Sequence, residues 1–367
     1  MNTIKRIAIS TGGGDAPGLN AVIRAAVLAA LHRGWECYGI HDGYNGLLFP
    51  ERYQDGGLMP LGRETVRGIT HLGGTIIGTT NRGHPFHLPV VDAEGNVAEI
   101  DRSDDLVAAF NGHGLDALIA IGGDGSMAIA HALVKKGMRI VGVPKTIDND
   151  LSGTVVTFGF DTAVAFATEC IDRLHSTAQA HQRVMVVEVM GRYAGWIALN
   201  AGIAATADAI LIPEIPYDLE RVADKIRTRA RRGRPFAVVV VAEGARPVGG
   251  HRVVRAHEIG RAERLGGIGH QVTAELQEIL GQEARCVVLG HLLRGGKPSA
   301  YDRLLALRFG AAAIRALEEG QSGIMVAVDP PNVLYVPLSE ATSRMKSVPV
   351  DGDTIMTARD LGISFGD

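Results

Sequence analysis

Cysteine is scarce in this sequence, neither charge is in excess, and long apolar runs are absent. The three cysteines, Cys37, Cys170 and Cys286, lie far apart without CxxC spacing, which argues against a disulfide framework and a structural zinc site. No segment approaches the roughly 18 apolar residues of a membrane span, and the apolar run near the N-terminus is too short for a signal peptide. We therefore expect a cytoplasmic protein that is neither exported nor inserted in a membrane.

The charge balance excludes two classes of partner. The chain has 37 lysines and arginines against 40 aspartates and glutamates, a formal net charge of -3. Such a chain has no global attraction to nucleic acid or anionic membrane, so we expect neither as a partner. Disorder is excluded as well, because hydrophobic residues make up 46% of the chain.

Short β-branched runs alternate with longer helical patterns along most of the chain. The order strand 4–11, helix 19–34, strand 35–43 is typical of βαβ units and a parallel sheet. The pattern predicts further strands at 116–123, 138–144, 183–190, 208–214, 236–244, 285–290 and 323–329, helices at 103–111, 126–137, 161–179, 195–206, 218–232, 255–281 and 300–319, and a hairpin at 90–100 that turns at 94–96.

So many strands exceed one comfortable sheet. We expect an α/β fold of two Rossmann-like domains, with largely parallel sheets and the active site in the cleft between them. The predicted division assigns 1–155 plus about 293–340 to the larger domain, 156–292 to the smaller one and about 341–367 to a C-terminal extension.

Glycine is abundant, at 47 of 367 residues. Three clusters, at 11–18, 121–126 and 292–298, fall where a predicted strand is followed by a helix. Glycine lets backbone amides approach an anion closely, and a helix N-terminus adds partial positive charge. Each cluster by itself is equally typical of a tight turn, but three on successive edges of one sheet favour phosphate binding at the strand ends.

The second cluster also matches another class of protein. Gly123, Gly125 and Ala128 satisfy GxGxxA, a dinucleotide-binding pattern, but that pattern needs an acidic residue about 20 positions later. Lys145 stands there instead, which weakens the dehydrogenase interpretation. Asp124 lies among the loop amides, where a bare carboxylate repels phosphate. A bridging Mg²⁺ would resolve this conflict.

The segment PKTIDND (144–150) follows a predicted buried strand and carries several side chains that can take part in catalysis. It carries Lys145, Thr146, Asp148 and Asp150. In an extended segment, alternation places the last three on the same side, so one carboxylate can accept a proton from an attacking hydroxyl while its neighbour orients water or metal. The alternative is an Asx turn in which Asp and Asn cap the backbone.

Cations are scattered at predicted strand ends further along the chain. The guanidinium fork suits phosphate, and several converging side chains would hold a phosphorylated sugar. Taken one at a time, each arginine is equally typical of a surface ion pair, and the histidine is equally typical of a structural role. The candidates are Arg183, Arg192, Arg285, His291 and Arg294.

With these motifs in this order, the sequence resembles the phosphofructokinase family from the first strand to about residue 320. The motifs are TGGGDAPGLNAVIR, GGTIIG, IGGDGS, PKTIDND, DTA, HQR, VVEVMGRYAG, AEG, VLGHLLRGG and YDR. The resemblance implies two α/β domains and phosphorylation of D-fructose 6-phosphate at O1 to fructose 1,6-bisphosphate in glycolysis. The larger domain would bind the phosphoryl donor and the smaller one the sugar phosphate.

The resemblance also implies roles for individual residues. Asp148 would be the general base, in a catalytic set with Lys145, Thr146 and Arg192, and Asp124 would bind Mg²⁺. The donor would be held by Gly14, Arg82, Gly123, Asp124, Gly125 and Ser126. The sugar phosphate would be held by Thr146, Asp148, Met190, Gly191, Arg192, Glu243, Arg285, His291 and Arg294. Arg183 would reach in from a neighbouring subunit, which implies a homo-oligomer, either a dimer or a tetramer.

Departures from the family pattern bear on the donor. Pyrophosphate-using members usually carry aspartate at the position of Gly125, whereas Lys145 is typical of those members. Because a missing side chain leaves space for the α-phosphate, we expect ATP, with pyrophosphate as the alternative. Arg82 stands one residue later than the arginine of many bacterial members, where this chain has Asn81.

The sequence argues against two other functions. NAD and lipid kinases share GGDG but lack PKTIDND, MGR and HLLRGG. A sugar-phosphate sensor without activity would be expected to have lost Asp124 or Asp148, and both are present.

Overall fold

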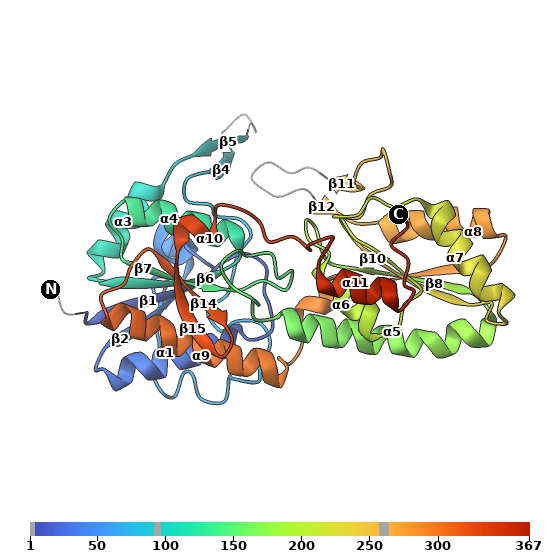
Figure 1. The fold of residues 1–367 in the computed structure, drawn as a ribbon. Coiled ribbons are helices and arrows are strands. Elements are labelled where there is room, and N and C mark those ends of the chain that lie inside the picture. The colour runs from blue at the N-terminus through green and yellow to red at the C-terminus, as the bar shows by residue number, and fades with distance from the viewer. Residues whose placement is uncertain (1–3, 92–96, 257–263) are drawn as a thin grey trace.

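The computed structural model describes residues 4–91, 97–256 and 264–367, which form two α/β lobes side by side (Figure 1). The first lobe is built on a seven-stranded sheet of order β15-β14-β7-β6-β1-β2-β3. Its five inner strands are parallel, and an antiparallel strand closes each edge. The strands are β1 Arg6–Thr11, β2 Glu36–Ile40, β3 Leu58–Pro60, β6 Ala117–Gly122, β7 Ile140–Pro144, β14 Ile324–Asp329 and β15 Asn332–Pro337.

Helices cover both faces of this sheet, as its continuously apolar strands require. Along β1, Ile7 and Ile9 face a core under α1 (Leu19–His32) and α9 (Ala300–Glu318), whereas Ala8 faces the opposite core. That second core is covered by α2 Asn45–Leu48, α3 Ser103–Gly112, α4 Asp124–Lys135 and α10 Leu338–Ala341.

The second lobe is built on a four-stranded parallel sheet of order β13-β8-β10-β9. Its strands are β8 Val184–Val189, β9 Ala209–Leu211, β10 Ala237–Ala242 and β13 Ala284–Val288. One face packs against α5 Phe160–His181, α6 Trp196–Ala204 and α11 Asp353–Asp360, and the other against α7 Leu219–Arg231 and α8 Ile268–Leu280. The predicted α/β class with largely parallel sheets is confirmed.

Three predictions about strands, helices and sheets differ from the structure. The helix expected at 255–281 begins only at Ile268, because Gly266 and Gly267 have φ angles of 128° and 98° that a helix does not allow. Before it, β11 (Val254–Ala256) pairs with β12 (Arg264–Leu265), and residues 257–263 lie outside the described part. The strand expected at 208–214 spans only β9.

The third difference concerns the third glycine cluster. It follows β13, which belongs to the second sheet, so the three clusters do not lie on one sheet. Its first residues also belong to the short 3₁₀ helix η2, Gly290–Arg294, so the cluster does not lead from the strand directly into an α-helix. The sequence predicts that a strand precedes the cluster, but it does not predict which sheet that strand joins.

The hairpin expected at 90–100 is present as β4 (Leu88–Val91) paired antiparallel with β5 (Val97–Ile100). Its predicted turn at 94–96 lies outside the described residues. None of the helices within the described ranges is long and apolar enough to cross a membrane.

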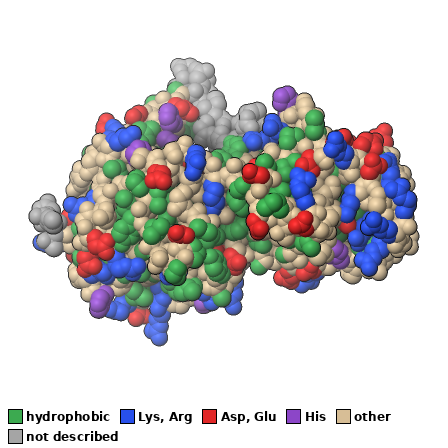
Figure 2. Space-filling view, in the orientation of Figure 1, with side chains coloured by type: hydrophobic (Ala, Val, Ile, Leu, Met, Phe, Trp, Pro, Cys, Tyr) green, Lys and Arg blue, Asp and Glu red, His purple; other side chains and the backbone are tan. Residues whose placement is uncertain are grey.

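Basic side chains gather over the α7 end of the second lobe, at the right of Figure 2. Carboxylates neutralise part of this charge within the fold. Arg227 lies 2.8 Å from Asp224, and Arg229 lies 2.9 Å from the buried Asp208. The basic run at 227–234 is therefore largely the end of a solvated helix, with its own counter-ions.

Candidate active site

The loops that follow β1 and β6 lie in direct contact at the carboxyl ends of their strands. We name residues 11–18 the first glycine loop and residues 121–126 the second. Gly12 N donates to Ile121 O at 2.9 Å. A β-carbon at Gly12 would lie only 2.6 Å from Ser126 Oγ, and one at Gly122 would also collide with Ser126. The lack of a side chain at these glycines is therefore needed so that the two loops can pack together, whether or not phosphate binds.

Residues 292–298, the third glycine loop, approach the first from the other lobe. Arg294 Nη1 donates to Asp15 O at 3.2 Å, and a β-carbon at Gly14 would lie 2.7 Å from the same nitrogen. A β-carbon at Gly73, in the segment GGTIIG, would collide with Gly296 O. Both lobes thus contribute to one site, although the third loop belongs to a different sheet.

Lys145 lies at the centre of this contact. Its side chain is buried, and its ammonium donates to Gly14 O. Burial, and then the nearby Arg294, lower its pKa to about 7, while Asp15 and Asp148 oppose the shift. Lys145 is therefore an enclosed cation between the first glycine loop and the carboxylates that follow.

Asp148 and Asp150 form a coupled pair of carboxylates in the aspartate loop, residues 145–150. The Oδ1 atom of each is enclosed and has no hydrogen-bond partner among the described residues. Burial, and then the charge of Asp150, raise the pKa of Asp148 to about 7, while Arg294 and Arg192 oppose the shift. The site thus holds carboxylate oxygens that are free to accept a proton or bind a cation.

The aspartate loop reaches this arrangement by a turn, so the extended alternation predicted from its sequence is wrong. The chain turns at Ile147 and Asp148, and Asn149 has a φ of 52°. Asn149 Oδ1 accepts from Thr157 N at 3.1 Å, as an Asx-type cap does. Ile147 is fully buried, and this anchors the turn in the core.

Asp124 opens α4 and lies near enough to Asp150 for the two charges to interact. Burial, and then the charge of Asp150, raise its pKa. Two nearby carboxylates that follow neighbouring strands suit Mg²⁺, which proteins commonly bind through one or two carboxylates plus substrate phosphates. Within the described ranges no group of three or more histidine, cysteine or acidic residues forms a metal cage, so substrate would have to complete the coordination.

The loop of residues 190–195 follows β8 and packs against the end of β10. We name it the sugar-side loop after the role that the motif resemblance implies for it. Gly244 N donates to Gly191 O at 3.1 Å, and a β-carbon at Gly244 would collide with Arg192 O. Burial raises the pKa of Glu243, while Arg192 opposes the shift. Met190 packs against the core of the second lobe. The structure therefore brings Met190, Gly191, Arg192 and Glu243 together.

The remaining predicted residues lie in three places. His291 is exposed on the 3₁₀ helix that carries Arg294, and Arg82 is exposed on the loop that pairs with the first glycine loop through Thr80. Arg183 and Arg285 lie at the amino ends of β8 and β13, where Glu283 contacts them at 3.7 and 2.6 Å. The structure therefore groups Arg285 with Arg183, not with His291 and Arg294.

Comparison with known proteins supplies the family. The family model described as phosphofructokinase matches residues 6–317. This chain belongs to the phosphofructokinase family. It is 52% identical to an ATP-dependent 6-phosphofructokinase of Chloroflexus aurantiacus over 363 residues, 99% of this chain and 98% of that protein. It is 47% identical to the pyrophosphate--fructose 6-phosphate 1-phosphotransferase of Amycolatopsis methanolica over 348 residues, 94% of this chain and 96% of that protein.

Solved phosphofructokinase structures share the fold. The Pichia pastoris phosphofructokinase in the T-state matches with a TM-score of 0.79 and 31% identity, over 98% of this chain and 37% of that longer chain. A pyrophosphate-dependent phosphofructokinase from Marinobacter aquaeolei gives a TM-score of 0.79 at 21% identity, over 98% of this chain and 91% of that chain. The resemblance stated from the motifs is confirmed.

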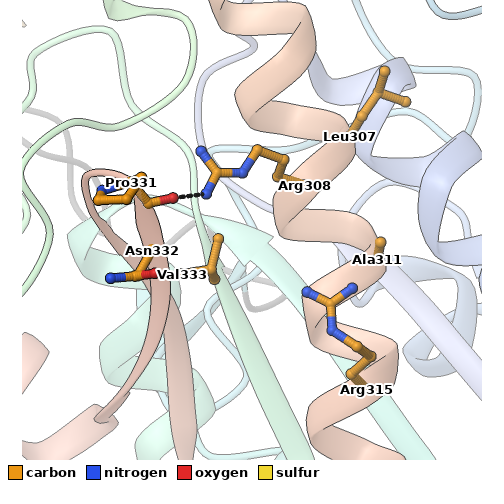
Figure 3. A pocket seen from close by; sticks show the side chains of 7 residues that line it. All are labelled: Leu307, Arg308, Ala311, Arg315, Pro331, Asn332 and Val333. Atoms are coloured by element: carbon orange, nitrogen blue, oxygen red, sulfur yellow. Dashed lines mark hydrogen bonds between the residues drawn. The ribbon is translucent and has the colours of Figure 1, made fainter.

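A groove of this phosphofructokinase lies away from these loops. It has a volume of about 420 Å³ between α9 and the β14–β15 hairpin, and Arg308 donates to Pro331 O at one side (Figure 3). Arg315 points toward the same groove, and Leu307, Ala311 and Val333 supply aliphatic surface. None of the predicted site residues lines it.

One contact of the aspartate loop was not predicted from the sequence. Lys346 donates to Asn149 Oδ1 at 2.9 Å, from the segment that had been assigned only as a C-terminal extension. It stands in no motif and is 197 residues away from Asn149 along the chain. No local pattern could have indicated it.

The charge of Asp150 is predicted to control the titration of Asp148. In the magnesium-free protein without substrates, Asp150→Asn should lower the pKa of Asp148, because a repelling carboxylate is removed. Carboxyl ¹³C NMR against pH measures this. Asp104→Asn, on α3 beside Lys136, is the control and should leave it unchanged. If the pKa of Asp148 were the same in Asp150→Asn as in the wild type, the charge of Asp150 would not control the titration of Asp148.

Gly14→Ala is predicted to displace Arg294 and leave the fold intact. The new β-carbon meets the end of a flexible side chain, which moves more easily than backbone. KM for the sugar phosphate should therefore rise several-fold, with little change in the thermal unfolding midpoint. Gly112→Ala, where a β-carbon meets no atom within 4 Å, is the control. Unchanged KM in Gly14→Ala would exclude a sugar-binding role for this contact.

Proposed function

We propose that this phosphofructokinase transfers the γ-phosphoryl group of MgATP to O1 of D-fructose 6-phosphate and forms fructose 1,6-bisphosphate in glycolysis. The observation that carries the proposal is the meeting of Asp148, from the first lobe, with Arg192 and Arg294, two cations from the second lobe. A general base surrounded by positive charge, at the ends of parallel strands, suits transfer between a phosphate donor and a hydroxyl.

Asp148 is the base. Its pKa of about 7 in the ligand-free chain lies near the working pH, which favours proton transfer in both directions. Asp148 takes the proton of the C1 hydroxyl as O1 forms its bond to the γ-phosphorus. The bond from the γ-phosphorus to the bridging oxygen breaks, and that oxygen leaves with ADP.

The surrounding charges stabilise the transferring group. Lys145 and Arg192 supply positive charge around the equatorial oxygens, and Thr146 is positioned by the bond from Thr157 Oγ1 to its carbonyl, 2.6 Å long. Asp124 and Asp150 would hold Mg²⁺, which neutralises charge on the donor phosphates when bound. Because phosphoryl transfer offers little covalent chemistry, positioning and charge account for the rate.

ATP is the donor, because the space beside Gly125 is open. A β-carbon built there meets no atom within 4 Å, so the loop leaves room for a nucleotide α-phosphate. The ATP-dependent names of relatives that cover nearly the whole chain support this assignment. Lys145 and the relatives named as pyrophosphate-dependent keep pyrophosphate as the second candidate donor.

The sugar phosphate is bound across subunits. Arg183 and Arg285 lie at the amino ends of their strands, away from the loops of their own site. From there both side chains reach the 6-phosphate in a neighbouring copy, alongside that copy's own His291 and Arg294. The protein is thus a homo-oligomer, a dimer or a tetramer, with donor domain 1–155 plus about 293–340 and sugar domain 156–292.

The choice of donor is predicted to depend on Gly125. Initial rates with fructose 6-phosphate should be high with ATP and low with pyrophosphate. Gly125→Asp should reverse this preference, because a carboxylate fills the open space, while Gly125→Ala adds bulk without charge and should weaken ATP use only partly. Turnover of the wild type with pyrophosphate alone would overturn the ATP assignment but not the sugar site.

Asp148→Ala is predicted to lower kcat by about a hundredfold or more, because proton transfer to a positioned base is lost. Binding of fructose 6-phosphate, measured by calorimetry, should remain close to that of the wild type. Asp148→Asn, which keeps the size of the side chain, is the matched variant and should be equally slow. Turnover like that of the wild type in either variant would exclude Asp148 as the base.

A further inference from the structure

A C-terminal strap, residues 343–348, crosses from the first lobe to the second over the aspartate loop. The chain passes between the lobes after β15 and α10, as Figure 1 shows in red. Met345 pairs with Leu151, and Lys346 N donates to Asp150 O at 2.9 Å. The strap is therefore joined by backbone contacts to the segment that carries the catalytic carboxylates.

The side chain of Lys346 uses all three of its N–H groups on this segment. Its ammonium donates to Asn149 Oδ1 at 2.9 Å, to Thr154 O at 3.0 Å and to Val155 O at 2.8 Å. A lysine ammonium has three donors and no acceptor, so its hydrogen-bonding capacity is filled. Lys346 thus connects the end of the aspartate loop to residues 154–155, which follow it in the chain.

The contact to Asn149 falls on the one residue of the aspartate loop with left-handed backbone. Its φ of 52° is uncommon for a residue other than glycine and persists where the surroundings impose it. Two donors hold its side-chain oxygen, Thr157 N at 3.1 Å and Lys346 Nζ. This conformation lies between Asp148 and Asp150 and sets the direction of both carboxylates.

The same strap is anchored to the second lobe. Trp196 Nε1 donates to Lys346 O at 3.1 Å, and Val348 N donates to Glu214 Oε1 at 2.9 Å. Glu214 also accepts from Gly195 N at 3.1 Å, at the end of the sugar-side loop. Lys346 therefore stands between the carboxylates of one lobe and the loop of Arg192 in the other.

We propose that Lys346 is a positioning residue for phosphoryl transfer, which holds the aspartate loop in its reactive conformation and fixes it relative to the sugar-side loop. The role rests on the proposed function, since it acts through Asp148. A small displacement of a catalytic group lowers the rate of the chemical step more than it lowers substrate binding. Loss of Lys346 should therefore reduce kcat and leave KM nearly unchanged.

The test compares Lys346→Met, which keeps the length of the side chain, with Lys346→Arg and with Arg344→Met as the control. Arg344 is exposed on the same strap. Lys346→Met should lower kcat by about tenfold or more, with KM for fructose 6-phosphate and ATP within about threefold of wild type. Lys346→Arg, which keeps cationic donors, should recover most of the loss, and Arg344→Met should equal the wild type.

Hydrogen exchange gives a readout that does not depend on activity. In Lys346→Met the amide of Thr157 should exchange faster, because Asn149 loses an anchor, while amides of β1 keep the wild-type rate. Four results would each overturn the proposal. Two are kinetic results for Lys346→Met: a kcat within twofold of wild type, or a fall in kcat accompanied by an equally large rise in KM. The others are a Lys346→Arg variant as slow as Lys346→Met, and faster exchange over the whole chain. A wild type without phosphofructokinase turnover overturns the proposed function instead, and Thr157 exchange still decides whether Lys346 positions the loop.

If Lys346→Met does not fold, Trp196→Phe takes its place. This variant keeps an aromatic ring and removes the N–H that holds Lys346 O, together with part of the indole surface over which Lys346 Nζ lies at 5.6 Å. It should lower kcat several-fold at unchanged KM and speed exchange at Thr157. Wild-type kcat and exchange in a folded Trp196→Phe variant would overturn the anchoring of the strap.

Discussion

Enclosed charge at the meeting point of the two lobes is the constraint on which the site depends. Asp148 and Asp150 repel each other in surroundings that disfavour ionised groups, and both have an oxygen without a partner among the described residues. Lys145 and Arg294 lie beside them and oppose that repulsion. Such an arrangement costs stability and persists because the loops around it are held from several directions.

The glycine clusters help to enclose these charges, but in a different way from the one that the sequence predicted. The sequence suggested glycine as a means for backbone amides to approach phosphate. In the structure, several of these glycines first let one loop pack against another, as Gly12 does with Ser126 and Gly14 with Arg294. Gly125 is different, because the space beside it is empty, and it is this space that bears on the choice of donor.

The site also depends on both lobes and on the C-terminal strap. Arg192 and Glu243 come from the carboxyl ends of β8 and β10, whereas the carboxylates come from the loop after β7. Rigid elements on each side can position these groups only if the lobes are fixed relative to each other. The contacts of Lys346 and Glu214 join the two sides at this point.

The sequence by itself determined the α/β class, most strands and helices, the family and most of the loops that meet at the candidate site. These follow from local patterns: apolar runs that must be buried, and polar motifs that follow them. The tertiary structure decided what depends on contacts between distant segments. It placed the third glycine loop on the second sheet, grouped Arg285 with Arg183 through Glu283, replaced an extended segment with a turn at Asn149, and brought Lys346 to the aspartate loop. Strand pairing and side-chain contacts across more than a hundred residues have no local signature, so only the folded chain reveals them.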